Sequence, residues 1–384
     1  MMLVDRNQQS DEGSYVQFAQ NLADGYYTDK SSPDLWFGPG LPLLLTPLAL
    51  MNAPLEAMRL LGPLLLLLAV ILFYEVLRLH VSAAIALVGA TALGLYVPFY
   101  PLLPSLHSEI PAVLLVVLFM SAVSRDLSEK RARHLLLGGA ALGFLGLTRV
   151  VFGWIILVGL VVWLAVWLVR RNEPSLRLAV VHALAIALCA PWLAYTYSIS
   201  HKVFYWGSSG GQSLYWMASP YPGQLGDWHA ESEVFTKPGL AANRPDFEKL
   251  RGLDQLESDD ELRRAAIRLI RTHPGRYARH LAENLSRIWF NTPYSFTPQK
   301  LDTLFYIIPN ALLLAGLLAC TPVVWLRRRS LPLEVGPFLV LLLLGVGVQI
   351  LLAAFGRMLS PLVPLIIWLV VIVVGSQVRL ATTR

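Results

Sequence analysis

Residues 151–171 read VFGWIILVGLVVWLAVWLVRR, an unbroken apolar run that ends in two arginines. A helix needs about 20 such residues to cross a bilayer core of roughly 30 Å, so this stretch predicts a transmembrane helix. The whole chain has the same character, because 55% of its 384 residues are hydrophobic and only 15% are charged. Soluble proteins carry about 25% charged residues. The sequence therefore predicts an integral membrane protein, and its net charge of +6 reflects arginines at span ends rather than a nucleic-acid partner.

Similar apolar runs lie on both sides of this stretch and predict an all-α polytopic bundle of about nine transmembrane helices. The predicted spans are Met58–Leu79, Ser82–Tyr100, Ser108–Ser124, His134–Thr148, Val151–Arg170, Leu176–Ser198, Thr303–Leu326, Leu333–Ala354 and Met358–Ser376. Both cysteines, Cys189 and Cys320, lie inside these runs. We expect them to pack as small hydrophobic side chains rather than to form a disulfide or a metal site.

Basic residues gather in four groups that fall on one side of the alternating path. These groups are Arg125, Lys130, Arg131 and Arg133; Arg170, Arg171 and Arg177; Arg327, Arg328 and Arg329; and Arg379 with Arg384. The positive-inside rule assigns that side to the cytoplasm. Three segments then face outward: the N-terminal stretch to about Asn52, the turn Pro101–His107 and the long segment His201–Asp302.

This path divides the chain into four parts. Residues 1–57 are predicted to form a first extracytoplasmic loop with juxtamembrane helices, and residues 58–200 a transmembrane bundle. Residues 201–302 are predicted to form an extracytoplasmic subdomain of loops and helices, and residues 303–384 the last spans. In the first part, the apolar residues of 11–22 follow helical spacing and predict an amphipathic helix on the membrane surface. Gly38–Met51, broken by three prolines, is expected to be surface-lying or re-entrant.

The second half of the subdomain predicts a helix from about Asp259 to Phe290 with a break at His273-Pro274. Tyr277, Leu281, Leu285 and Ile288 form one apolar stripe after the break. Arg276, Arg279 and Arg287 lie off that stripe. This pattern is typical of a basic amphipathic helix lying against a bilayer.

Four polar groups collect on the outer side: Asp11-Glu12, His107-Ser108-Glu109, Arg149 and Arg357. The acidic residues equally fit helix starts, where carboxylates favour the dipole, and lone arginines at an interface can snorkel. Together, however, two acidic and two basic sites on one membrane face favour transfer of a group from a lipid-linked phosphate. A carboxylate can deprotonate the acceptor, and arginines can bind the phosphate as charge builds on it.

The order of several short motifs carries a family resemblance. These motifs are the Asp-Glu-x-x-Tyr start of Asp11–Leu22, Gly38-Pro39-Gly40-Leu41-Pro42, Ser108-Glu109, Leu147-Thr148-Arg149, Ser209–Gly211, His273-Pro274 with Tyr277, and Arg357-x-x-x-Pro361-x-x-Pro364. In these residues the chain resembles membrane glycosyltransferases of the GT-C fold. The closest resemblance is to the group, glycosyltransferase family 39, that includes protein O-mannosyltransferases and the lipid A aminoarabinose transferase.

The resemblance implies an enzyme of the plasma membrane or bacterial inner membrane, with its site on the extracytoplasmic face. Its donor would be a polyprenyl-phosphate sugar, its acceptor a protein, lipid or glycan, and its reaction would invert the anomeric carbon. Asp11 would be the base and Glu12 would support it. The residues implied at the donor phosphate are Arg149, Arg357, Glu109, His107 and Tyr15. Family members have a spanning helix before the acidic pair, and Met1–Ser10 is too polar for one, so we expect this chain to lack that first span.

Several alternatives stay open at this point. The loop Trp206–Trp228, and in particular Trp206, Tyr215 and Trp216, is expected to contact the acceptor or a sugar, because aromatic faces suit sugar rings, although core packing explains such residues equally well. A divalent metal could be held by Glu109 and His107, but two ligands are too few to specify one. A lipid or polysaccharide flippase and an inactive membrane scaffold are the competing functions.

Overall fold

The structure is a computed structural model that describes residues 11–296, 301–327 and 330–382. Within these ranges the chain forms helices and no strands. The first half contains α1 (Asp11–Ala23), α2 (Gly40–Leu50), α3 (Leu55–Arg59), α4 (Leu61–Arg78), α5 (Ala83–Gly94), η1 (Val97–Leu102), α6 (Glu109–Glu129), α7 (Ala132–Thr148), α8 (Val151–Arg170) and α9 (Glu173–Ser200). The second half contains α10 (Gly210–Ala218), α11 (Glu231–Thr236), η2 (Pro238–Asn243), α12 (Arg244–Glu248), α13 (Gln255–Thr272), α14 (Pro274–Phe290), η3 (Leu301–Thr303), α15 (Leu304–Arg327), α16 (Val335–Gln349), η4 (Gly356–Leu362) and α17 (Val363–Thr382).

Six helical segments of the described chain are long and apolar enough to cross a membrane. They are Leu55–Arg78, Glu109–Glu129, Val151–Arg170, Glu173–Ser200, Leu304–Arg327 and Gly356–Gly375. These six agree with the predicted helical membrane protein. Three other predicted spans form the shorter apolar helices α5, α7 and α16, so the count of nine stays a prediction. α5 is short because the chain turns at Gly94 and continues as η1, whose prolines remove backbone donors.

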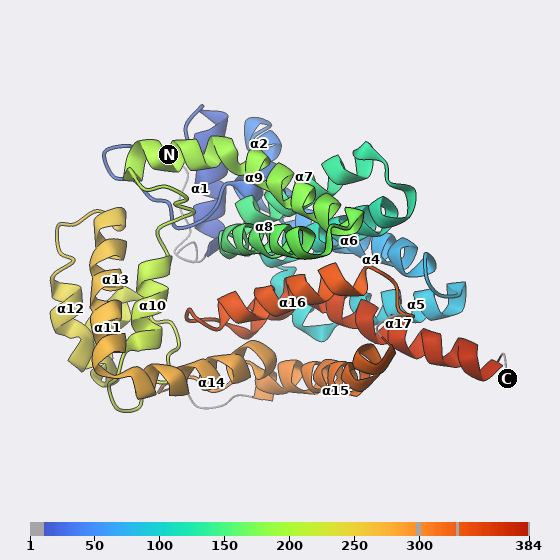
Figure 1. The fold of residues 1–384 in the computed structure, drawn as a ribbon. Helices are drawn as coiled ribbons and strands as arrows, with labels where there is room; N and C mark the ends of the chain where they lie inside the picture. Colours follow the sequence, from blue (N-terminus) through green and yellow to red (C-terminus); the bar gives the residue numbers. More distant parts are fainter. Residues whose placement is uncertain (1–10, 297–300, 328–329, 383–384) are drawn as a thin grey trace.

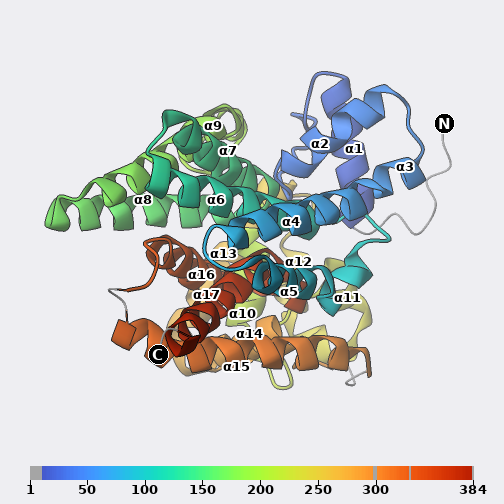
Figure 2. The same cartoon turned by 90° about the vertical axis from the view of Figure 1, so that its right-hand side faces the viewer.

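The helices form a bundle in which the N-terminal helices and the C-terminus lie at different ends. Figure 2 shows α1, α2 and α3 gathered at one end of the molecule and the C-terminus at the opposite end. Figure 1 shows α10 to α13 as a compact group beside the bundle, which α14 connects to α15. α6 lies mostly buried inside the protein, whereas α15 is largely exposed. An apolar helix that is exposed in this way is the kind that faces lipid.

The helical subdomain is divided where the sequence predicted. α13 begins with a capping box in which Asp254 and Glu257 bond each other's backbone N–H groups, an arrangement that satisfies two orphan donors of a helix start. α13 ends at Thr272, and Pro274 begins α14. The break at His273-Pro274 is therefore confirmed.

The face that α14 buries differs from the predicted one. Arg287 is fully buried, whereas Leu285 of the predicted apolar stripe is 40% exposed. The Arg287 guanidinium donates hydrogen bonds to the backbone oxygens of Pro293, Leu225 and Gly226. Arg287 thus fixes neighbouring loops, and the prediction that it belongs to the basic, exposed face of an amphipathic helix is wrong.

Asn284, on the same buried face of α14, holds the segment that leads into η4. Its amide nitrogen donates to the backbone oxygens of Ile350 and Leu352, and its side-chain oxygen accepts from the N–H of Ala354. Buried backbone groups need such partners when they lie outside a helix. Asn284 therefore fixes the chain just before Arg357.

α1 is helical as predicted, but protein rather than membrane covers its apolar face. Tyr15, Phe18 and Ala19 are all at least 95% buried, and the helix packs against α2. Phe18 stacks on Tyr27, with ring centres 4.6 Å apart. This packing fixes the start of α1, where Asp11 and Glu12 lie.

Candidate functional site

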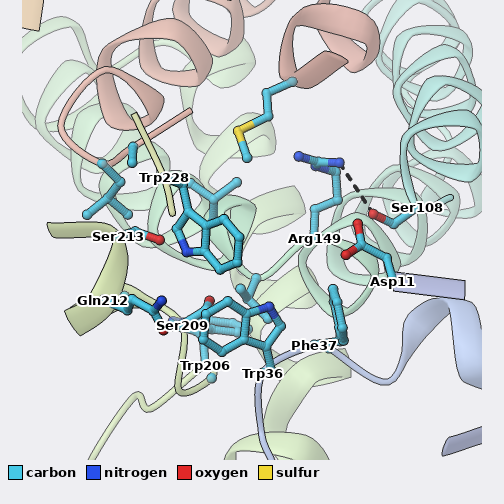
Figure 3. A pocket seen from close by; sticks show the side chains of 18 of the residues that line it. Asp11, Trp36, Phe37, Ser108, Arg149, Trp206, Ser209, Gln212, Ser213 and Trp228 are labelled. Carbon is cyan, nitrogen blue, oxygen red and sulfur yellow. Dashed lines mark hydrogen bonds between the residues drawn. The ribbon is translucent and has the colours of Figure 1, made fainter. Parts of the chain in front are cut away.

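A cavity of about 790 Å³ lies where the ends of several helices meet. It is lined from the start of α1, the loop before α2, the start of α6, the α7–α8 junction, the start of α10 and the loop before η4. Figure 3 shows that Asp11, Ser108 and Arg149 lie on one side of it, and Trp36, Trp206 and Trp228 on the other. The cavity therefore has a charged side and an aromatic side.

Four of the predicted site residues meet at the charged side. Glu109 Oε1 lies 2.8 Å from Arg149 Nη1 and 3.3 Å from Arg357 Nε. Arg357 Nη2 donates to Asp11 Oδ2 at 2.6 Å. Residues up to 346 positions apart in the sequence thus form one network of two carboxylates and two guanidinium groups. Because the formal charges cancel, the network can stay ionised although Glu109 is 97% buried.

The two arginines differ in how much of their hydrogen-bonding capacity is used. All three nitrogens of Arg357 have partners, namely Asp11, Glu109 and His107. Among the described residues Arg149 has partners at Nη1, which contacts Glu109 and also donates to Ser108 at 3.3 Å. Its Nε is buried without a hydrogen-bond partner in the described part of the chain. A buried donor left in this state marks a place where a ligand acceptor would be bound favourably.

His107 takes part through its Nδ1 atom, which lies 3.1 Å from Arg357 Nη1. A guanidinium can only donate, so Nδ1 accepts and the ring proton lies on Nε2, which is 2.9 Å from Ser105 Oγ. Burial lowers the pKa of His107, and the adjacent Arg357 lowers it further, against the opposing effect of Glu109. The imidazole is therefore held neutral as a positioning group for Arg357.

Glu12 faces away from the cavity. Both of its oxygens accept from Arg59, at 3.0 and 2.8 Å, and Oε1 also accepts from the N–H of Leu106. Burial alone would raise the pKa of Glu12, but the hydrogen bonds from Arg59 and Leu106 outweigh burial and lower it. Glu12 thus ties α1 to α3 and to the segment before α6. In the described part of the chain Glu12 makes no hydrogen bond to Asp11, Glu109, Arg149 or Arg357, so any support that it gives to Asp11 comes from the position in which it holds α1.

Tyr15 lies against the same network. Its side chain is buried, lines the cavity and interacts with Ser108. Burial raises the pKa of its phenol, as does the nearby Glu109. Tyr15 therefore stays protonated at neutral pH and can act as a hydrogen-bond donor at the charged side.

Two glycines bring the loop before α2 onto the end of α7. A Cβ atom on Gly38 would lie 2.1 Å from the carbonyl oxygen of Leu147, and one on Gly40 would lie 2.3 Å from Thr148 Oγ1. Only glycine permits such close backbone contact. The Gly38-Pro39-Gly40 motif therefore fixes the position of α7 just before Arg149.

The three predicted aromatic contacts separate into two classes. Trp206 lines the cavity, and its ring lies so close to Gly153 that a Cβ there would be 2.2 Å away. Tyr215 and Trp216 are 0% and 1% exposed in a core formed with Phe247, and neither lines the cavity. Core packing is therefore the better interpretation of Tyr215 and Trp216, and neither residue is placed to contact a ligand in the cavity.

Sequence reasoning missed two residues on the aromatic side. Asp34 and Trp36 line the cavity from the loop before α2. They come directly before the Gly38-Pro39-Gly40 motif, and this proximity was the available signal. Trp228, at the end of the predicted contact loop Trp206–Trp228, also lines the cavity, although no spacing distinguished it from the neighbouring aromatic residues.

The arrangement does not fit a divalent metal at the charged side. Among the described residues no three His, Cys, Asp or Glu side chains group together as metal ligands. Glu109 is shared between two arginines and His107 accepts from one of them. A cation placed there would face two guanidinium charges.

Comparison of this chain with protein-family models, with curated proteins and with solved structures found no match.

Proposed function

We propose that this chain is a membrane glycosyltransferase that moves a sugar from a polyprenyl-phosphate donor to an extracytoplasmic acceptor. The observation that carries the proposal is the shared network of Asp11, Glu109, Arg149 and Arg357 at the wall of one large cavity. The network combines a carboxylate that can accept a proton with guanidinium groups that can bind a leaving phosphate, as such a transfer needs.

Arg149 is the residue that we assign to the donor phosphate. Its side chain is 91% buried and its Nε has no partner among the described residues, so a phosphate oxygen would complete its hydrogen bonding. Charge-assisted bonds between arginine and phosphate are among the strongest in proteins, and they strengthen in a dry site. Glu109 holds this arginine in place through Nη1, at 2.8 Å.

Asp11 is the residue that we assign as the base. Arg357 holds its Oδ2 atom, while Oδ1 makes no hydrogen bond in the described part of the chain. In the proposed step Oδ1 accepts the proton of the acceptor hydroxyl, whose oxygen then bonds to the anomeric carbon. The bond from that carbon to the phosphate oxygen breaks, and its electron pair leaves with the phosphate. Attack opposite the leaving group inverts the anomeric carbon.

The lipid part of such a donor would stay in the bilayer beside the spanning helices. Trp154, in the first turn of α8, lines the cavity and is 48% exposed. Val151 and Met358 line the same region. An apolar margin next to a charged site suits a ligand that is part lipid and part phosphate.

The test uses the full chain reconstituted in phospholipid vesicles with polyprenyl-phosphate [¹⁴C]mannose or [¹⁴C]glucose and an envelope extract as acceptor. The chain should move the label into a new product and release polyprenyl phosphate. Asp11→Asn should abolish this transfer, whereas Asp24→Asn, at an exposed carboxylate after the same helix, should not. Full activity of Asp11→Asn would refute the assignment of Asp11 as the base. Movement of intact donor across the vesicle without a new glycosidic bond would favour the flippase instead.

A further inference from the structure

The aromatic side of the cavity has its own geometry. Trp36 and Trp228 lie edge to face, with ring centres 6.1 Å apart and planes at 70°. Both line the cavity, where Figure 3 shows them, and both are half-buried. Two indoles set at an angle form a corner that can hold a flat apolar face of a ligand.

A row of rings connects this corner to the charged side. Trp228 lies next to Phe355, with ring centres 6.5 Å apart, and the Arg357 guanidinium lies over Phe355 at 5.4 Å. Arg357 in turn holds Asp11. A ligand bound at the indole corner would thus lie one ring away from the group that holds the base.

Asp34 is an acidic group that lines the cavity beside Trp36, and its surroundings differ from those of Asp11. Its Oδ1 accepts from the N–H of Trp36 at 2.8 Å. Within the described part of the chain it makes no other side-chain hydrogen bond, and no Lys, Arg or His lies within ion-pair distance. Burial raises the pKa of Asp34. A carboxylate without a cation is suited to accept hydrogen bonds from hydroxyl groups rather than to bind an anion.

Two indole N–H groups of this side also lack partners. The Nε1 atoms of Trp206 and Trp228 are both buried without a hydrogen bond in the described part of the chain. Trp206 itself is 98% buried. Indole nitrogen only donates, so both atoms call for an acceptor such as a hydroxyl oxygen.

The two loops that carry these residues are held firmly. Tyr27 donates from its hydroxyl to the carbonyl oxygen of Phe37, and the N–H of Ser208 donates to the carbonyl oxygen of Leu35. Asp227, next to Trp228, accepts from the N–H of Ser295. The corner is therefore formed before any ligand binds, which lowers the entropy cost of binding.

From these observations we infer that Trp36, Trp228 and Asp34 form an acceptor subsite for a neutral sugar ring, so that the acceptor is a glycan. The role of the bound sugar as acceptor rests on the proposed function, whereas the binding of a neutral sugar ring at these residues does not. A pyranose offers an apolar C–H face to the indoles, hydroxyl donors to Asp34 and hydroxyl acceptors to the indole N–H groups. A lipid tail would leave all three polar groups unsatisfied. The subsite also offers no strand edge, among the described residues, that could pair with an extended peptide.

The experiment measures glycan binding in the absence of donor, so that it does not depend on transfer. The full chain in lipid nanodiscs is titrated calorimetrically with neutral hexasaccharides of glucose, mannose, galactose and N-acetylglucosamine, and with the cationic hexamer of glucosamine. At least one neutral hexasaccharide should bind. Trp36→Ala, Trp228→Ala and Asp34→Asn should each weaken it about tenfold, or about 1.4 kcal/mol.

Controls separate a binding role from a folding role. Trp325→Ala removes a tryptophan that is 72% exposed on α15 and should bind as the unchanged chain does. Trp36→Phe keeps an aromatic face and should restore most of the affinity lost in Trp36→Ala. All variants should unfold at the temperature of the unchanged chain, and Asp11→Asn should bind the glycan normally while it fails in transfer.

The outcomes are distinguishable from those of the proposed function. If no neutral hexasaccharide binds, or only the glucosamine hexamer binds, the inferred subsite is refuted. It is also refuted if Trp36→Ala and Trp228→Ala bind as well as Trp325→Ala. If glycan binds as described but Asp11→Asn transfers sugar normally, the subsite stands and the assignment of the base fails.

Discussion

α6 carries a buried carboxylate–arginine pair at each end, and the two pairs differ in how complete they are. Near its C-terminal end Asp126 accepts two bonds from Arg177, at 2.8 and 2.5 Å, one to each oxygen. At its first residue Glu109 offers one oxygen to both Arg149 and Arg357. The two carboxylate side chains are equally buried, each 4% exposed.

Burial of an ion pair is therefore not by itself a sign of function. The pair of Asp126 and Arg177 is bidentate, uses both carboxylate oxygens and does not line the cavity. Such a pair contributes to structure. The pair of Glu109 and Arg149 leaves a buried N–H group without a partner at the wall of a large cavity. Incomplete pairing beside a cavity is the stronger indication of a ligand site.

Replacing each arginine in turn should show that the two pairs differ in their effect on activity. Arg149→Gln should lower the rate of sugar transfer by about 100- to 1000-fold, as expected for loss of a group that stabilises developing charge. Arg177→Gln should leave the rate per folded molecule unchanged, because that arginine lies outside the cavity. The measurement is transfer of label at saturating donor, normalised to folded protein. Equal losses in both variants would remove the distinction between the pairs.

Replacing Asp126, near the C-terminal end of α6, should show that this pair contributes to stability rather than to activity. Asp126→Asn should lower the free energy of unfolding by about 3 kcal/mol, because Arg177 would lose its bidentate partner and keep only the longer contact to Glu173, at 3.8 Å. Thermal unfolding in detergent should show a lower Tm, and activity per folded molecule should stay normal. The opposite pattern, normal Tm and lost activity, would show that Asp126 serves the site after all.

The helices were largely predictable from sequence because their apolar runs are long. Val151–Arg170 is both the predicted span and the observed α8, and the break at His273-Pro274 follows directly from the missing N–H of proline. Shorter runs were extended too far, as where Ser82–Tyr100 divides into α5 and η1. Hydropathy records how apolar a segment is, but not where tertiary contacts end its helix.

The site was predictable only in part, for a physical reason. Asp11, Glu109, Arg149 and Arg357 were found because charged residues beside apolar spans are conspicuous. Glu12, which turned out to bond Arg59, could not be separated from its neighbour, because adjacent residues on a helix point about 100° apart and sequence does not say which one faces a cavity. Arg287 was misjudged because its partners are backbone carbonyl groups, which no side-chain pattern reveals.

Glu12 offers a smaller test of the same contrast between structure and chemistry. Glu12→Gln should lower the free energy of unfolding by about 2 kcal/mol, since it weakens charge-assisted bonds to Arg59 and Leu106. Because the pKa of Glu12 is lowered in the folded chain, its contribution is present above the carboxyl pKa of the unfolded chain and is lost as pH falls through the folded value. Tm measured against pH should therefore fall less steeply on the acid side in Glu12→Gln. Transfer should remain measurable, unlike in Asp11→Asn; complete loss with an unchanged Tm would place Glu12 in the chemistry.

The smallest effect concerns His107, which distinguishes the network at the start of α6 from the pair at its end. The pKa of His107 is lowered by burial and by Arg357, so its neutral form contributes stability above the ordinary histidine pKa, and this is lost as pH falls through the folded value. Below that value the ring gains an N–H that opposes the Arg357 guanidinium, and transfer should fall severalfold on the acid side. His107→Asn keeps a neutral acceptor toward Arg357 and should flatten this part of the pH–rate profile, with little change at neutral pH. An identical acid limb in both proteins would show that protonation of His107 does not govern the position of Arg357.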